Sequence, residues 1–310
     1  MNKKIAYIIL AHNDPKQLKR LIEALNYREE NDFFIHIDQK SDIDLFKVLF
    51  EDIKNVYFVE KRAFIQWAAF SQILALKELL KCVVESENHY NRVVCLSGLD
   101  YPIFSNEKIL SEFEADPKKE FIMGMNLTKC NTLAQRERFT VYHFFRSIKI
   151  RNRNIKRLFS GTSKIIMRKL PFRKEPQVKL GNTKCDIYMG SDWWGITYEC
   201  ARHVYHRLCT EHELLRYFKT AFAPREMCVQ TIVFNSKYGK NAIHYDDVEY
   251  NGLSRLTPLH FIIYKDEIKV YNETHYDLLL NSGKMFFRKA KSGQSETLIK
   301  MIEKQRILED

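Results

Sequence analysis

The sequence lacks the short motifs that most often mark nucleotide-binding and metal-binding proteins. No G-x-G-x-x-G or G-x-x-x-x-G-K-[ST] pattern follows a predicted strand, which counts against a dinucleotide-binding Rossmann domain and against a P-loop. The seven cysteines form no C-x-x-C pair, and their odd number argues against a disulfide framework or a zinc site. Cys82, Cys95 and Cys228 lie in apolar runs, where free cysteine acts as a small hydrophobe. A reducing compartment therefore fits best.

Long apolar runs are also missing. Lys3-Lys4 precedes an apolar run of only six residues, Ile5 to Leu10, which is too short for the core of a signal peptide and far too short to span a bilayer. No internal repeat, low-complexity tract or flexible linker interrupts the chain. We therefore expect a cytoplasmic protein that folds as one domain over residues 1–310.

Acidic residues are scarce in one segment. The whole chain has 50 Lys and Arg against 39 Asp and Glu, a net charge of +11, while Arg146–Lys174 contains eleven Lys and Arg and no acid. With Gly161 and Pro171, this segment is predicted to be a long surface loop or short helices. It is interpreted either as a surface for anionic lipid headgroups or a lipid-diphosphate-linked acceptor at the inner face of the cell membrane, or as a solvated loop without a partner.

The charge and a pI near 9.2 also raise the alternative of a nucleic-acid-binding protein without catalytic activity. No helix-turn-helix, RNP or zinc pattern accompanies the charge, and the excess is confined to one segment. We therefore favour a protein that does not bind nucleic acid.

The sequence does contain a regular alternation of strands and helices. The apolar run Ile5–Leu10 is typical of a strand buried on both faces, and Asn13 or Asp14 followed by Pro15 predicts the start of a helix. Further strands are predicted at 32–38, 56–59, 92–96 and 121–125, and a helix at 67–80. This pattern predicts an α/β fold with a mostly parallel central sheet flanked by helices, and ligands beyond the carboxyl ends of its strands.

Two carboxylates stand among apolar neighbours in the second half of the chain. Asp192 lies between a glycine turn and Trp193-Trp194, and Glu226 is the third residue of a helix that Pro224 is predicted to begin. Such carboxylates indicate acid/base or sugar-binding chemistry. Asp192 is also interpretable as a turn residue and Glu226 as half of a capping box, although Ala223 has no side-chain oxygen to complete that box.

Seven stretches in this order resemble the bacterial branch of the core-2/I-branching β-1,6-N-acetylglucosaminyltransferase and peptide O-xylosyltransferase family. These stretches are Ala6–His12, Phe34–Lys40, Trp67, Leu96–Ile103, Gly190–Trp193, Pro224–Glu226 and Met285–Lys289. The resemblance implies a GT-A-like glycosyltransferase that moves a sugar, N-acetylglucosamine or xylose, from a UDP-sugar to a hydroxyl of a glycan or lipid-linked glycan. It further implies inversion at the anomeric carbon, no divalent metal or other cofactor, and a role in cell-surface polysaccharide synthesis.

The resemblance also assigns roles by position. It makes residues 1–125 the nucleotide-binding half and residues 126–310 the acceptor and catalytic half. Glu226 is then the general base, and Asp192 and Trp193 bind the donor sugar. The nucleotide-binding positions are His12, Asp38, Arg62, Trp67 and Asp100, and the phosphate-binding positions are Arg288, Lys289 and Arg255.

Several of these positions keep a second interpretation. Asp38-Gln39-Lys40 stands where many glycosyltransferases have D-x-D, so one metal-binding carboxylate is missing, although Asp246-Asp247 keeps a metal role open. Arginine and lysine can neutralise a departing diphosphate in place of a metal, but Arg288-Lys289 is also interpretable as a solvated helix end. Trp67 is also interpretable as a core aromatic, and Ala68-Ala69 replaces glycines common in relatives. Arg136–Phe145 is predicted to form a wall for the acceptor.

Overall fold

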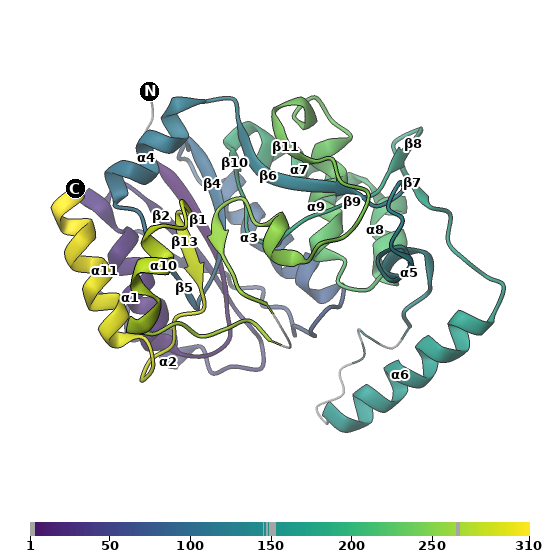
Figure 1. The fold of residues 1–310 in the computed structure, drawn as a ribbon, viewed down its shortest axis with the longest axis horizontal. Helices are drawn as coiled ribbons and strands as arrows, with labels where there is room; N and C mark the ends of the chain where they lie inside the picture. Colours follow the sequence, from purple (N-terminus) through teal and green to yellow (C-terminus); the bar gives the residue numbers. More distant parts are fainter. Residues whose placement is uncertain (1–3, 145, 147, 149–152, 265–266) are drawn as a thin grey trace.

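A mixed eight-stranded sheet runs through the middle of the molecule (Figure 1). The computed structural model describes residues 4–264 and 267–310, apart from residues 145, 147 and 149–152. The strand order is β11 (Ala242–Tyr245), β6 (Glu120–Asn126), β10 (Gly195–Thr197), β4 (Arg92–Ser97), β1 (Ile5–Ala11), β2 (Asp32–Ile37) and β3 (Val56–Phe58), and β9 (Tyr188–Met189) also pairs with β6.

The central strands are parallel, as the sequence predicts. β3, β2, β1 and β4 pair in parallel along one half of the sheet, and β11 is parallel to β6. β10 lies antiparallel between β4 and β6, so it joins the two parallel groups. The prediction of a mostly parallel sheet is confirmed, and the antiparallel β10 is an addition to it.

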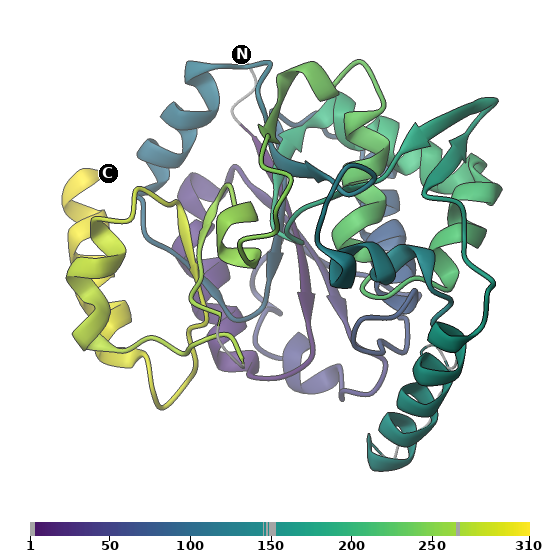
Figure 2. The same cartoon turned by 45° about the vertical axis from the view of Figure 1, so that its right-hand side comes forward.

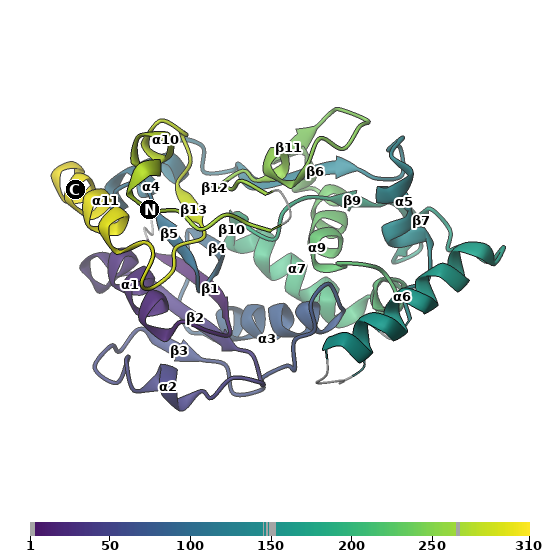
Figure 3. The same cartoon turned by 60° about the horizontal axis from the view of Figure 1, so that its bottom comes forward.

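Both faces of the sheet are covered by helices, which is what a parallel sheet requires. Every residue of β1 is buried, and its alternate residues belong to two separate cores. Ile8 packs with α3 (Ser71–Glu85), α7 (Tyr198–Thr210) and α9 (Arg225–Phe234). Ile9 packs with α1 (Pro15–Leu25), α4 (Asn106–Ala115) and α11 (Glu296–Glu309), and Figure 3 shows the two groups on opposite sides of the sheet.

The seven cysteines are free thiols and are distributed unevenly between these cores. The buried thiols Cys95, Cys130, Cys200 and Cys228 all belong to the core beneath α3, α7 and α9, whereas the core beneath α1, α4 and α11 contains no cysteine among the described residues. The sequence-based expectation that cysteines act here as small hydrophobes agrees with this placement.

Smaller elements complete the chain. A second sheet has the order β12 (His260–Phe261), β13 (Phe286–Arg288), β5 (Asp100–Pro102), and β7 (Gln177–Leu180) forms a hairpin with β8 (Thr183–Asp186). The remaining helices include α2 (Asp44–Lys47), α5 (Leu133–Thr140), α8 (His212–Lys219) and α10 (Tyr276–Leu280). In the second sheet Arg288 pairs with Asp100 across β13 and β5, which brings a cation from the end of the chain to the end of β4.

The basic segment contains one long helix, α6 (Arg153–Lys169), which extends away from the sheet (Figure 1, Figure 2). The prediction of a loop or short helices is therefore wrong for these 17 residues. Positions 147 and 149–152 of the segment lie outside the described residues. None of the described helices combines the length and the apolar composition that a membrane crossing requires.

Candidate active site

A cavity of about 590 Å³ lies at the carboxyl ends of β1, β2 and β4, and its volume is in the range of small-molecule sites. The structure gathers seven of the sequence-predicted residues around it: His12, Asp38, Trp67, Asp192, Trp193, Glu226 and Arg288. Arg62, Asp100, Lys289 and Arg255 are not in the lining. The edge of the sheet that the strand–helix alternation indicated is thus where the cavity lies.

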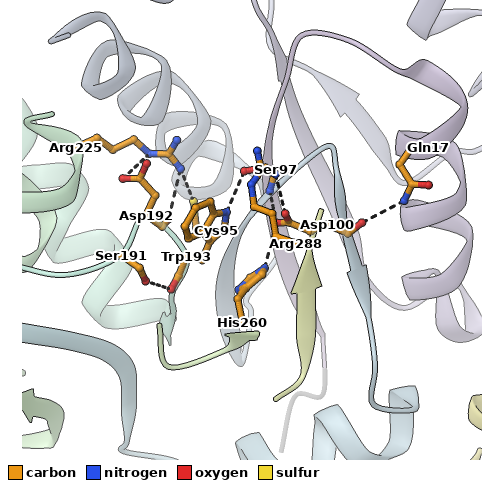
Figure 4. A network of polar contacts seen from close by, with 10 residues as sticks. All are labelled: Gln17, Cys95, Ser97, Asp100, Ser191, Asp192, Trp193, Arg225, His260 and Arg288. Atoms are coloured by element: carbon orange, nitrogen blue, oxygen red, sulfur yellow. Dashed lines mark hydrogen bonds and ion pairs between the residues drawn. The ribbon is translucent and has the colours of Figure 1, made fainter. Parts of the chain in front are cut away.

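Asp192 lies in the turn between β9 and β10 and faces the buried guanidinium of Arg225 (Figure 4). Arg225 Nε is 3.6 Å from Asp192 Oδ1, and Arg225 Nη2 donates to Cys95 Sγ at 3.2 Å. Burial alone would lower the pKa of Arg225, but Asp192, Cys95 and Asp100 together outweigh burial and raise that pKa. Asp192 Oδ1 and Arg225 Nε are buried and face each other at 3.6 Å, and neither makes a hydrogen bond within the described part of the chain.

Glu226 is the second residue of α9, and its carboxylate forms an ion pair with Arg138 of α5. The capping-box alternative does not apply, because the N-cap is Pro224, which has no N–H for the glutamate to accept from. Burial raises the pKa of Glu226, while the Arg138 guanidinium acts in the opposite direction. The net direction is upward, so Glu226 is a stronger proton acceptor than an ordinary glutamate.

Arg288 reaches the cavity from β13 and is held by Asp100, which lies behind it (Figure 4). Asp100 is fully buried, and its carboxylate accepts hydrogen bonds from Arg288 Nη1 at 2.8 Å, from the Ser97 backbone N–H at 2.7 Å and from His260 Nε2 at 3.1 Å. Asp100 thus does not line the cavity. It positions Arg288, whose guanidinium lies 5.3 Å from the centre of the Trp193 ring.

Trp193 separates the two charged groups. Figure 4 shows its ring between Arg225 with Asp192 on one side and Arg288 with Asp100 on the other. Its Nε1 donates to Ser97 Oγ at 3.0 Å, which fixes the orientation of the indole. A fixed aromatic face beside the Asp192 carboxylate in the same cavity lining is an arrangement that suits a sugar ring.

Asp38 connects the loops beyond the end of β2 through hydrogen bonds and an ion pair. Its carboxylate accepts from the backbone N–H of Lys40 at 3.1 Å and of Ile65 at 3.2 Å, and it pairs with Lys40 Nζ at 3.2 Å. Arg62 lies outside the cavity, where its Nη1 donates to the Ser41 carbonyl at 3.1 Å. The neighbouring His12 is part of the lining, and partial burial lowers the pKa of its imidazole.

Trp67 lies at the mouth of the cavity and not in the core. The predicted helix does not begin there, because α3 starts at Ser71, and the Trp67 side chain is 71% exposed. Its ring meets the edge of Phe222 at 5.7 Å between centroids, and the guanidinium of Arg146 lies 5.9 Å from its centre. The core-aromatic interpretation of Trp67 is therefore wrong.

Two alanines in the cavity wall have a left-handed backbone. Ala68 has φ 55° and Ala223 has φ 48°, and the Ala223 N–H donates to the Ala68 carbonyl at 3.0 Å. Such a conformation costs an L residue roughly 1–2 kcal/mol. The chain thus adopts at Ala68 a conformation typical of glycine although no glycine is present, and strained backbone of this kind is common at functional sites.

Two other predicted phosphate ligands lie further away. Lys289 follows β13 outside the lining, and burial, together with Arg288, lowers the pKa of its ammonium group. Arg255 is exposed in a 3₁₀ helix (Leu253–Leu256). The structure instead adds Arg138 and Arg225 to the site. Arg225 is part of the Pro-Arg-Glu motif, whereas Arg138 has no signal of its own within the predicted acceptor wall, because its partner is distant in sequence.

Nothing in the described part of the chain brings three His, Cys, Asp or Glu side chains close enough together to hold a metal ion. Asp246 and Asp247 line a separate hollow of about 240 Å³ and do not contribute to the main cavity.

The fold and the cavity together define an α/β protein with a ligand site at the carboxyl edge of its sheet, lined by carboxylates paired with arginines. Residues 5–250 match the model of the Core-2/I-Branching enzyme family, and the chain belongs to this family.

The proteins to which the chain is similar in sequence include glycosyltransferases. The chain is 29% identical over 150 residues to the mouse beta-1,3-galactosyl-O-glycosyl-glycoprotein beta-1,6-N-acetylglucosaminyltransferase 4, a match that covers 46% of this chain and 31% of that protein. It is 27% identical over 241 residues to rat xylosyltransferase 2, covering 75% of this chain and 25% of that protein. The chain thus matches about a third or less of the length of these relatives.

Proposed function

We propose that this protein is an inverting glycosyltransferase of GT-A-like fold that transfers a sugar from a UDP-sugar to a hydroxyl of a glycan without a divalent metal. The names of its relatives support the reaction class, with N-acetylglucosamine and xylose as the first donor sugars to test. One observation carries the proposal: Glu226 and Asp192 line the same cavity, each with its own arginine, and Arg288 reaches the same space.

In this mechanism each part of the cavity has a separate task. The uridine lies toward His12, Asp38 and Trp67, and the donor sugar lies over Trp193 with its hydroxyls toward Asp192. The diphosphate meets Arg288, whose Nε has no hydrogen-bond partner among the described side chains. A fixed guanidinium stabilises the charge that develops on the leaving diphosphate.

Glu226 acts as the general base. Its carboxylate takes the proton of the acceptor hydroxyl while that oxygen forms a bond to the anomeric carbon. The bond from that carbon to the diphosphate oxygen breaks on the opposite face, and UDP leaves with the electron pair. Because Arg138 occupies the carboxylate in the structure, the acceptor hydroxyl must share or displace this contact before proton transfer.

Replacing Glu226 by Gln tests the proposal. We expect turnover to fall by a factor of roughly 10²–10⁴, the usual contribution of a general base, while UDP affinity stays unchanged because the uridine end is untouched. Glu199→Gln is the matched control, since Glu199 also lies in the first turn of a helix, α7, but is exposed. Turnover by the Glu226→Gln variant equal to that of the control would remove Glu226 from the mechanism. A panel of UDP-sugars then identifies the donor.

The compartment, the acceptor and the cellular role are further parts of the proposal. An enzyme that uses UDP-sugars in the cytoplasm would supply a cell-surface polysaccharide through a glycan or lipid-linked glycan acceptor. A screen of such acceptors with the donor that the protein hydrolyses most rapidly would test this assignment. Incorporation of the donor sugar into none of them would contradict it.

A further inference from the structure

Helix α6 carries an apolar stripe that faces solvent. Leu158, Phe159, Ile165 and Ile166 are 66%, 53%, 58% and 55% exposed. Their spacing of i, i+1, i+7 and i+8 places them on one face of a helix. Phe172, just after the helix, is 69% exposed. An exposed apolar surface of this extent marks an interaction site.

The rest of this segment is attached to the body of the protein. Ser163, within α6, is buried, and Arg168 forms an ion pair with Glu137 of α5. Beyond the helix, the buried Lys174 donates from Nζ to the Tyr217 carbonyl at 3.0 Å. One end of α6 is thus fixed to α5 and the following residues to α8, while the helix itself extends away from the body of the protein (Figure 2) and its apolar stripe is exposed.

The positive charge of the segment indicates which kind of partner binds the apolar stripe. Residues 146–174 contain eleven Lys and Arg and no acid. A second copy of the chain, docked symmetrically through this stripe, would bring two such cationic segments together. An anionic bilayer attracts the cations and accepts the apolar side chains at the boundary of its headgroups.

We propose that α6 is an interfacial helix that docks the protein on an anionic membrane by inserting Leu158, Phe159, Ile165 and Ile166 between the lipids. This docking does not depend on the sugar chemistry. The same α5 that binds Arg168 through Glu137 also provides Arg138 to the cavity. If the proposed function holds, docking therefore brings the acceptor wall to the membrane surface, where a lipid-linked acceptor is presented.

Vesicle sedimentation with the full chain tests the docking. The protein should pellet with vesicles of phosphatidylcholine and phosphatidylglycerol and remain in solution with phosphatidylcholine alone. The double variant Phe159→Ser, Ile166→Ser removes the centre of the stripe and leaves every Lys and Arg in place. We expect it to bind the anionic vesicles more than about tenfold more weakly, because two apolar side chains no longer enter the boundary of the headgroups.

The matched control is Leu45→Ser, Val48→Ser, which removes two equally exposed apolar side chains at α2 and should leave vesicle binding unchanged. Equal melting temperatures in all variants establish that the fold is intact, and unchanged helical circular dichroism checks α6. Equal pelleting of the two double variants, or equal binding to both kinds of vesicle, would overturn the proposal. A dimer that only the α6 variant loses, without vesicle binding, would assign the stripe to a second copy of the chain.

Discussion

Asp100 lies outside the cavity but determines the position of a residue inside it. Burial alone would raise the pKa of Asp100, yet His260 and Arg288 outweigh burial and lower it. Burial also lowers the pKa of His260, so its ring is neutral at pH 7 and donates from Nε2. The cation that stabilises the Asp100 carboxylate is therefore Arg288, and the two charges depend on each other.

Replacing Asp100 by Asn should lower the free energy of unfolding at pH 7 by about 3 kcal/mol, because it leaves Arg288 without its buried partner. Asp100 has a lowered pKa in the folded state, so its stabilisation is present above the unfolded value of about 3.9. This stabilisation is lost as the pH falls through the pKa of Asp100 in the folded protein. The difference in the free energy of unfolding between variant and parent should become smaller there. Urea unfolding at pH 7 and at an acidic pH below the folded-state pKa of Asp100 checks this, with the exposed Asp52→Asn as control. Equal stability of Asp100→Asn and Asp52→Asn at pH 7 would contradict the pairing.

Ala68→Gly and Ala223→Gly should each stabilise the fold by about 0.5–1 kcal/mol. Glycine adopts a positive φ without the strain of an L residue, and this gain exceeds the entropy that glycine adds to the unfolded chain. Thermal unfolding measures the effect. Ala75→Gly in the buried middle of α3 is the control and should destabilise by about 1 kcal/mol. A loss of stability at Ala68 and Ala223 similar to that at Ala75 would show that their left-handed backbone carries no strain.

At the scale of elements, α5 and α9 form one charged wall of the cavity through the ion pair of Arg138 and Glu226. α9 supplies the carboxylate from its first turn, and α5 supplies the cation that limits how far burial raises the pKa of Glu226. A change in α5 is thus expected to alter the protonation of a residue that lies 88 positions away in sequence.

Arg138→Gln should raise the pKa of Glu226 further, since it removes the charge that opposes burial. A base must be deprotonated to act, so the acid limb of the pH–turnover profile should move to higher pH. The nearby Arg136→Gln, which changes a charge outside the cavity lining, should leave the profile in place. An acid limb that does not move in Arg138→Gln would show that the ion pair does not control the base.

The sequence predicted those elements whose signals are local. The apolar run Ile5–Leu10 identified a buried strand, and the predicted cap proved to be Asp14, whose carboxylate accepts from the Gln17 N–H at 3.1 Å. Helix α6 was missed because Gly161 and Pro171 were interpreted as loop signals, whereas Gly161 lies within the helix and Pro171 lies beyond its end. β10 has only three residues, and its antiparallel pairing is set by neighbours distant in sequence. The motif positions predicted seven of the site residues that line the cavity. The pairing of Arg138 with Glu226, by contrast, arises only when α5 folds against α9.

At the scale of the whole molecule, the arginines that line the cavity and the most cationic segment come from different parts of the sequence, although Arg146 at the start of that segment lies 5.9 Å from the centre of the Trp67 ring. Arg288 and Arg225 belong to the cavity, whereas the largest excess of Lys and Arg belongs to the segment around α6. A nucleic-acid-binding protein would lose affinity for its ligand steeply as salt rises. A nucleotide held by buried side chains and hydrogen bonds would not, because buried pairs are screened little.

Turnover and UDP binding should therefore persist in the presence of EDTA, and added Mg²⁺ should not raise them. The expected reason is that Arg288, held by Asp100, neutralises the diphosphate. Turnover assays with and without EDTA, together with UDP thermal shifts at low and high salt, measure both points. Loss of turnover on chelation that Mg²⁺ or Mn²⁺ restores would show that the phosphates need a metal.

The uneven distribution of cysteine makes one side of this protein chemically observable. Among the described residues, the buried thiols all lie beneath α3, α7 and α9, so the rate at which they react with an alkylating reagent measures the opening of that layer alone. A donor that fills the cavity should slow this reaction at Cys228 in α9. The opposite layer has no cysteine among the residues that the structure describes, so it would give no signal in the same experiment.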